Sequence, residues 1–166
     1  MRLSRMVAAG GLLCVAAATA ARRRLVVITV EGHSMEPTLL DRDRVLVLRR
    51  PLRRVRRGQI VVLESPHPEG LWARLPPPGH RLQGREWVVK RAVALPGDPV
   101  PPAVAAAAGI EDEDARVPSG SLVLIGDGKR SGDSRKWGPC PGDRLLGVVV
   151  ARLPRRNSAG PPSALG

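Results

Sequence analysis

The sequence predicts a mainly β domain, and three observations favour this fold class. The chain has 166 residues, enough for one domain with a short appendage. Neither Phe nor Tyr occurs, so Val, Leu, Ile and Ala must fill the interior. The Val-rich runs are short, and β-branched residues favour strands. Turn-forming residues separate these runs, as in antiparallel sandwiches and barrels.

Six short apolar runs are predicted to be strands because turn signals bound each of them. They span residues 25–31, 43–49, 59–64, 86–95, 121–126 and 145–153. Residues 66–84 include three consecutive prolines and are predicted to be a loop. Residues 101–114 are an alanine run closed by an acidic cluster, and we expect a surface insertion there.

The N-terminus carries an apolar segment, residues 6–21, with arginines on both sides. It is shorter than the roughly 20 residues that a membrane span needs. An uncleaved anchor, a cleaved export signal and a mitochondrial targeting segment all fit, and we favour the anchor. Positive charge is as dense after the segment as before it, so the positive-inside bias leaves the orientation open. We divide the chain into an anchor region (1–24), a folded domain (25–153) and a disordered tail (154–166).

The formal net charge is +12, nearly all of it from arginine. Nucleic acid, an anionic membrane surface or genomic base composition would each explain such a charge. Stacking aromatics are almost missing and no nucleic-acid-binding motif appears, so the membrane surface is the better functional interpretation. Cys14 and Cys140 are far apart in sequence, and neither a disulfide nor a metal site is indicated.

Ser34 lies in the turn that follows the first predicted strand, within the segment VEGHSMEPTLL. A hydroxyl at this place is exposed and held by a rigid neighbour, while Gly32 allows close approach of a substrate. His33 is adjacent but points elsewhere if the strand geometry persists. A plain strand-ending turn explains this segment equally well when it is taken alone.

Lys90 lies inside an apolar strand, WVVKRAV. Strand alternation places Val88, Lys90 and Ala92 on one face, with Arg91 on the other. If the Lys90 face is buried, loss of solvation lowers the lysine pKa towards neutrality and makes the amine a general base. A serine beside a neutral lysine is a known nucleophile–base pair. The alternative is a surface lysine whose amine reaches water.

These segments resemble the conserved boxes of the type I signal peptidase family. Gly32 to Leu39 is similar to the nucleophile box G-x-S-M-x-P-T-L, and residues 43–47 resemble the next box. Lys90 to Asp98 is similar to the lysine box K-R-V-x-x-x-P-G-D, departing at Ala92. The polar segment 126–138 resembles the final box. The four boxes occur in family order and cover roughly residues 30–150.

The resemblance implies an antiparallel β-sheet catalytic domain over residues 25–153, preceded by one N-terminal transmembrane helix. It implies a Ser-Lys serine endopeptidase in which Ser34 attacks the scissile carbonyl and Lys90 takes its proton. The Ser34 backbone N–H and Gly32 would serve the oxyanion hole. Ser131 would orient the Lys90 amine.

The resemblance further implies a structural ion-pair cluster and a substrate-binding surface. Arg91, Asp133 and Arg135 would form the cluster, and Met35 and Pro37 would contact substrate. No cofactor or metal is expected. The partners would be preproteins with small residues before the cut and membrane lipid, with no specific nucleic acid. The enzyme would be a single-pass protein of the cell membrane, with its catalytic domain on the outer face.

Two departures affect the final box, where Gly128 replaces the usual Asn and the spacing to Ser131 is one residue shorter. The short chain resembles compact members such as mitochondrial inner-membrane peptidases and bacterial maturation proteases. A dedicated maturation protease for one precursor therefore stays open beside a general signal peptidase. A catalytically silent, basic membrane-surface protein is the alternative outside the enzyme class.

Overall fold

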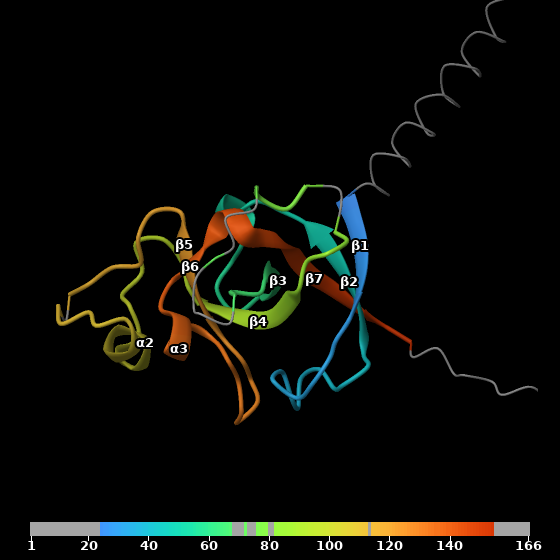
Figure 1. The fold of residues 1–166 in the computed structure, drawn as a ribbon, viewed down its shortest axis with the longest axis horizontal. Helices are drawn as coiled ribbons and strands as arrows, with labels where there is room; N and C mark the ends of the chain where they lie inside the picture. Colours follow the sequence, from blue (N-terminus) through green and yellow to red (C-terminus); the bar gives the residue numbers. More distant parts are fainter. Residues whose placement is uncertain (1–23, 68–71, 73–75, 80–81, 113, 155–166) are drawn as a thin grey trace, which may run out of the picture.

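One curled antiparallel sheet forms the folded domain (Figure 1). The computed structural model describes residues 24–67, 72, 76–79, 82–112 and 114–154. Seven strands follow the order β1-β2-β7-β3-β4-β5-β6, which confirms the predicted mainly β class. The predicted anchor segment and almost all of the predicted tail lie outside the described residues. In the part that is described, no helix combines the length and hydropathy needed to cross a bilayer.

Every run predicted to be a strand forms one, with ends that differ by no more than two residues. The six are β1 (Leu25–Thr29), β2 (Arg44–Arg49), β3 (Ile60–Glu64), β4 (Trp87–Ala94), β5 (Ser121–Ile125) and β7 (Leu145–Leu153). The sequence did not indicate β6 (Cys140–Pro141), because two residues are too few to show an alternating pattern.

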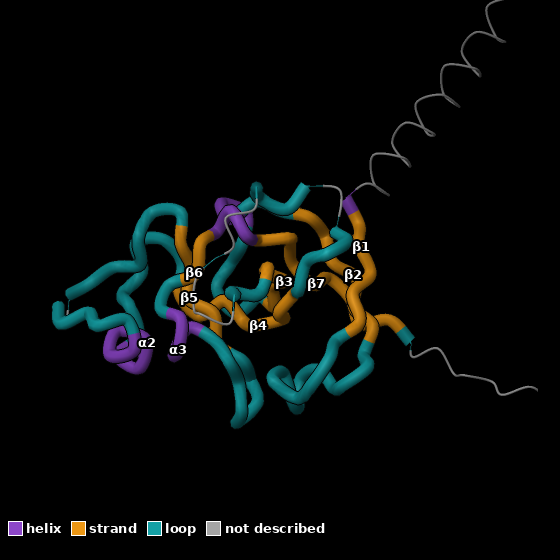
Figure 2. The backbone as a smooth tube through the Cα atoms, in the orientation of Figure 1, coloured by secondary structure: helices purple, strands orange, loops and turns teal. Residues whose placement is uncertain are grey.

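Short helical segments fill the connections between strands (Figure 2). They are η1 (Leu52–Arg54), α2 (Pro102–Ala107), α3 (Ser134–Trp137) and η2 (Gly142–Arg144). Helix α2 lies inside the region predicted to be a surface insertion, and its Val104 is fully buried. Proline is well suited to the first turn of a helix and alanine to its interior, so this low-complexity run forms a helix that packs onto the domain.

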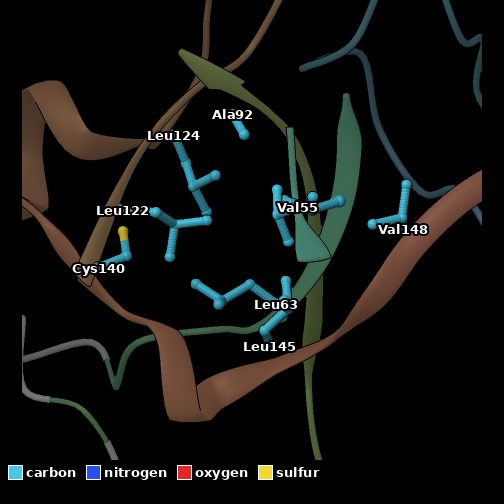
Figure 3. Packing of buried hydrophobic residues seen from close by; sticks show 9 residues of the cluster. Val55, Leu63, Ala92, Leu122, Leu124, Cys140, Leu145 and Val148 are labelled. Atoms are coloured by element: carbon cyan, nitrogen blue, oxygen red, sulfur yellow. The ribbon is translucent and has the colours of Figure 1, made fainter. Parts of the chain in front are cut away.

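The interior consists of three clusters of aliphatic side chains. The largest joins strands from both halves of the chain, and Figure 3 shows Leu122 and Leu124 side by side, projecting into the cluster that also holds Leu63. A second cluster lies under β1 and β2, and a third packs α2 against β5. Valine and leucine supply most of this volume, as the lack of Phe and Tyr requires.

The sheet order gives β4 a neighbour on each side and leaves β1 at an edge. Lys90 on β4 pairs with Val61 of β3, and Arg91 pairs with Ile125 of β5. Two backbone hydrogen bonds join the ends of the turn between β1 and β2. They run from Val30 N–H to Asp43 O and from Arg42 N–H to Val30 O, and both are 2.8 Å long. The turn that contains Ser34 is therefore held at its base.

Leu124→Ala tests the central cluster. Leu124 is 0% exposed, so its truncation leaves a cavity and is expected to lower the free energy of unfolding by about 2–5 kcal/mol. Urea unfolding followed by circular dichroism measures the loss. Leu40→Ala is the matched control, since Leu40 is 38% exposed and its truncation should cost roughly 1 kcal/mol or less. Equal losses in both variants would contradict the assignment of Leu124 to the core.

Candidate active site

The turn between β1 and β2 presents Ser34 towards β4. Gly32 has a φ of +80°, a conformation that glycine adopts at little cost. Its N–H donates to Asp41 Oδ1 over 2.8 Å, which ties the two sides of the turn together. The Gly32 N–H is thus already engaged within the turn. Within the described residues, the Ser34 N–H has no protein acceptor.

Two residues predicted to contact substrate are placed differently by this turn. Met35 is 0% exposed and packs in the cluster under β1 and β2, beside Val30 and Leu39. The turn thus directs the Met35 side chain into the interior while Ser34 faces β4, and the substrate contact of Met35 stays a prediction. Pro37 is exposed on the outer side of the turn and follows a cis peptide bond.

Lys90 reaches Ser34 from the buried face of β4. Its Nζ donates a hydrogen bond of 2.6 Å to Ser34 Oγ, although 56 residues separate the two in sequence. Lys90 is 3% exposed, as the predicted burial of its strand face requires. Desolvation by burial lowers the pKa of Lys90; nearby Asp133 raises it and Arg135 lowers it, and the net direction is down.

The loop after β5 closes against the backbone of the nucleophile turn. Gly128 N–H donates to Ser34 O over 2.9 Å. A Cβ added at Gly128 would lie 2.3 Å from His33 O, and one at Gly126 would lie 2.5 Å from Ser34 O. Neither position has room for a side chain in this arrangement. Close contact with the turn therefore accounts for Gly128 where the family pattern has Asn.

Two separate ion pairs replace the single cluster expected from the sequence. Arg91 pairs with Asp127 over 2.5 Å, whereas Arg135 pairs with Asp133 over 2.7 Å. Strand alternation explains the split, since Arg91 and Lys90 occupy opposite faces of β4 and Asp133 acts on the Lys90 side. Including Arg91 with Asp133 and Arg135 in one cluster was therefore wrong.

Asp127 was missed by the sequence analysis, although it connects the turn to the sheet. It accepts a 2.6 Å hydrogen bond from Thr38 of the nucleophile turn as well as the guanidinium of Arg91 on β4. These contacts hold the pKa of Asp127 below its ordinary value, with the Arg91 bond as the largest cause. Its position beside Gly126 in the final box was the available signal.

Asp133 is a fully buried carboxylate beside the lysine. Burial alone would raise its pKa, but hydrogen bonds from Arg135, Gly126 and Ser131 outweigh this effect and lower the pKa to about 2. The Ser131 hydroxyl also makes a long contact of 3.5 Å with Gly132 O. Among the described residues, no hydrogen bond joins Ser131 to Lys90, whereas Ser131 does bond to Asp133, whose charge acts on the lysine.

His33 does not take part in the Ser34–Lys90 pair. Its Nδ1 lies 2.7 Å from Glu36 Oε1, and the side chain is 73% exposed. The hydrogen bond to Glu36 raises the pKa of His33. The imidazole thus points away from Ser34, in agreement with the sequence argument against it as a base.

A groove of about 710 Å³ leads to the two residues. Its lining includes residues 27–31 of β1 and the turn after it, residues 85–90 of β4 and the loop before it, and both Ser34 and Lys90. Val27, Ile28 and Val88 give part of the lining an apolar character. Strand β1 has only β2 as a sheet partner, so its other edge borders the groove.

The arrangement places a hydroxyl nucleophile and a buried amine in direct contact at the end of a groove. A lysine with a lowered pKa is neutral in a larger fraction of molecules near neutral pH, and only the neutral amine can take the proton of a serine hydroxyl. Over the described ranges, no group of three His, Cys, Asp or Glu side chains is arranged to hold a metal ion.

Comparison with known proteins relates the chain to membrane-associated peptidases. The family model described as "Signal peptidase, peptidase S26" matches residues 3–107. Mitochondrial inner membrane protease subunit 1 of Xenopus tropicalis is 29% identical over 138 residues, which cover 81% of this chain and 72% of that protein. Probable signal peptidase I-2 of Synechocystis sp. is 28% identical over 145 residues, covering 75% of this chain and 61% of the relative. The chain thus spans about three fifths of that second relative.

Lys90→Met tests the energetic cost of the buried amine. The folded-state pKa of Lys90 lies below its ordinary value of 10.5, so the folded protein binds this proton less tightly than the unfolded chain. The cost to stability is therefore complete below the folded pKa and disappears as pH rises towards 10.5. We expect Lys90→Met to raise the free energy of unfolding at pH 6 and to do so much less at pH 9.5, as measured by urea unfolding.

Lys129→Met is the matched control for this experiment, because Lys129 is exposed. It should change stability little and equally at the two pH values. A stability gain in Lys90→Met that is the same at pH 6 and pH 9.5 would show that Lys90 carries no desolvation penalty.

Proposed function

The chain belongs to the signal peptidase family, peptidase S26, and is a serine peptidase of the signal peptidase I type; we propose that it removes signal peptides or leader segments from exported preproteins with a Ser34–Lys90 dyad. The observation that carries the dyad is the 2.6 Å hydrogen bond between Lys90 Nζ and Ser34 Oγ on a buried strand face. Both residues fall within the part of the chain that the family model matches.

In the proposed reaction, Lys90 acts in its neutral form. Its amine takes the Ser34 hydroxyl proton while Oγ forms a bond to the scissile carbonyl carbon. The resulting Lys90 ammonium gives that proton to the leaving amine as the peptide bond breaks. Water then attacks the acyl-serine ester while Lys90 takes a proton from that water. The Lys90 ammonium returns that proton to Ser34 Oγ as the ester bond breaks, which releases the new carboxyl end and restores Ser34 and neutral Lys90.

The developing oxyanion needs hydrogen-bond donors that are fixed in advance. In this turn the Gly32 N–H is already bonded to Asp41, whereas the Ser34 N–H remains available as a donor. The Ser34 carbonyl accepts a hydrogen bond from Gly128, which fixes the orientation of that peptide. We assign the oxyanion contact to Ser34 N–H and a backbone-shaping role to Gly32. Ser131 and Asp133 act as positioning residues around the Lys90 amine.

The groove suits an extended polypeptide. A substrate segment lying along the free edge of β1 would gain backbone hydrogen bonds there and would place a scissile bond at Ser34. Small residues such as Ala before the cut fit side-chain sites that are shallow and apolar. Pro37 on the exposed turn lies beyond the groove lining, so we assign it no substrate contact.

Membrane attachment is the second part of the proposal. Residues 6–21 would serve as a single membrane anchor, with the peptidase domain on the outer face of the membrane, where exported preproteins emerge. The apolar composition of this segment and the membrane named for the Xenopus relative support this placement.

Two variants test the dyad, with a secretory preprotein that carries an Ala-x-Ala site as substrate for the detergent-solubilised full chain. Ser34→Ala removes the nucleophile, and Lys90→Arg replaces the base by a guanidinium that stays protonated. Each is expected to lower kcat at least about a thousandfold. Product formation is followed by mass spectrometry, and circular dichroism checks that both variants fold. Substantial cleavage by either variant would refute the dyad.

No cleavage by the wild type would instead favour a dedicated maturation protease with a narrower substrate. In that case the Ser34→Ala variant, which binds but does not cut, should retain the natural precursor during purification from its own cell membranes.

The apolar sites before the cut are tested by changing the substrate. Leu in place of Ala at the residue just before the scissile bond should lower kcat/KM roughly 10- to 100-fold, because the extra methylene groups exceed a small site. The same replacement two residues after the cut is the control and should have little effect. Equal rates for Ala and Leu before the cut would exclude a selective site.

A further inference from the structure

A basic pocket lies on the domain apart from the groove, and no step of the proposed reaction uses it. Its volume is about 490 Å³, and five arginines line it: Arg24, Arg49, Arg50, Arg53 and Arg54. They come from the residue before β1, from the end of β2 and from η1, so the fold gathers charges that lie up to 30 positions apart. No acidic residue is among the lining residues.

Several arginines elsewhere in the described part of the domain form ion pairs with carboxylates, whereas most of the pocket arginines do not. Ion pairs bind Arg57 to Asp98, Arg85 to Glu64 and Arg152 to Asp43. Within the residues that the structure describes, no such pair involves Arg24, Arg50, Arg53 or Arg54.

The walls of the pocket are part of the folded domain and hold the arginines near one another. Arg49 donates from Nη1 to Gly79 O over 2.7 Å, which ties the end of β2 to the loop before β4. Leu145 and Leu146 of β7 form an apolar side. A guanidinium group can donate two parallel hydrogen bonds to two oxygens of one phosphate. A concave site with several such groups and an apolar side therefore suits a phosphate ester that carries a hydrocarbon portion.

The position of the pocket in the chain indicates where such a phosphate would come from. Arg24 follows the apolar segment 6–21 by only two residues, so a membrane anchor there brings the pocket to the headgroup layer. Leu25, the next residue, is 39% exposed. No aromatic side chain lines the pocket to stack on a base, so nucleic acid is the less suitable occupant.

We propose that the arginine pocket binds the phosphate headgroup of an anionic phospholipid and so holds the peptidase domain against the membrane surface. The proposal rests on the proposed membrane attachment but not on the Ser34–Lys90 reaction. Each basic residue near an anionic surface adds to binding, and the effect weakens with salt.

The test uses the full chain in neutral detergent micelles, titrated with short-chain phosphatidylglycerol while thermal unfolding is recorded. Phosphatidylglycerol should raise Tm, and phosphatidylcholine should not. The variant Arg50→Gln/Arg53→Gln/Arg54→Gln should weaken the apparent affinity roughly 100-fold. The control Arg116→Gln/Lys129→Gln/Arg130→Gln removes the same charge at exposed positions outside the pocket lining and should bind as the wild type does.

Further arms identify the source of the phosphate and separate this proposal from the catalytic one. Sodium phosphate or a single-stranded oligonucleotide that raises Tm as much as phosphatidylglycerol would overturn the assignment to lipid. Equal loss of affinity in the pocket and control variants would show general charge attraction and would also overturn it. Cleavage of a soluble Ala-x-Ala peptide by the pocket variant should match the wild type, so a failed dyad and a failed lipid site give different results.

Discussion

The active site depends on keeping an amine inside an aliphatic core. Lys90 projects from β4, which has a hydrogen-bonded strand on each side, so its backbone is fixed and its side chain lies on the buried face of the strand. Its partner Ser34 is on a turn that is closed at its base and held from above by Gly128. Both groups are thus positioned before any substrate binds, and burial rather than a second catalytic side chain lowers the lysine pKa.

The charges around Lys90 follow from the same requirement. The carboxylate of Asp133 by itself favours the protonated lysine, which cannot act as the base in the proposed dyad. Arg135 pairs with Asp133 and offsets much of this attraction, while Asp127 and Arg91 pair on the other face of β4. The two carboxylates nearest the site, Asp133 and Asp127, therefore each have an arginine partner, and Lys90 has the hydroxyl of Ser34.

Strand β1 connects the two surfaces that the proposals concern. Its residues form one wall of the groove that ends at Ser34, and the residue before it, Arg24, belongs to the arginine pocket. Attachment of the pocket to headgroups would thus fix the orientation of the groove relative to the bilayer. In the sequence, positive charge on both sides of the apolar segment left the membrane orientation open. In this proposal, the charge after the segment binds lipid headgroups at the membrane surface.

The sequence by itself determined the strands and the chemical pair. Short Val-rich runs between turn residues predicted six strands correctly, and alternation along β4 separated Lys90 from Arg91 because side chains of a strand face opposite sides. Local pattern carries this information, since the period of a strand is visible over a few residues. The order of the boxes, which matches that of the family, identified Ser34 and Lys90 as a candidate nucleophile and base.

Only the tertiary structure decided which groups meet. It buried Met35 in the core, joined Arg91 to Asp127 rather than Asp133, and placed the Ser131 hydroxyl where it bonds to Asp133. These outcomes depend on how a turn, a strand and a loop from distant parts of the chain pack together. Sequence spacing does not contain those distances, and the gathering of five arginines around one pocket has the same origin.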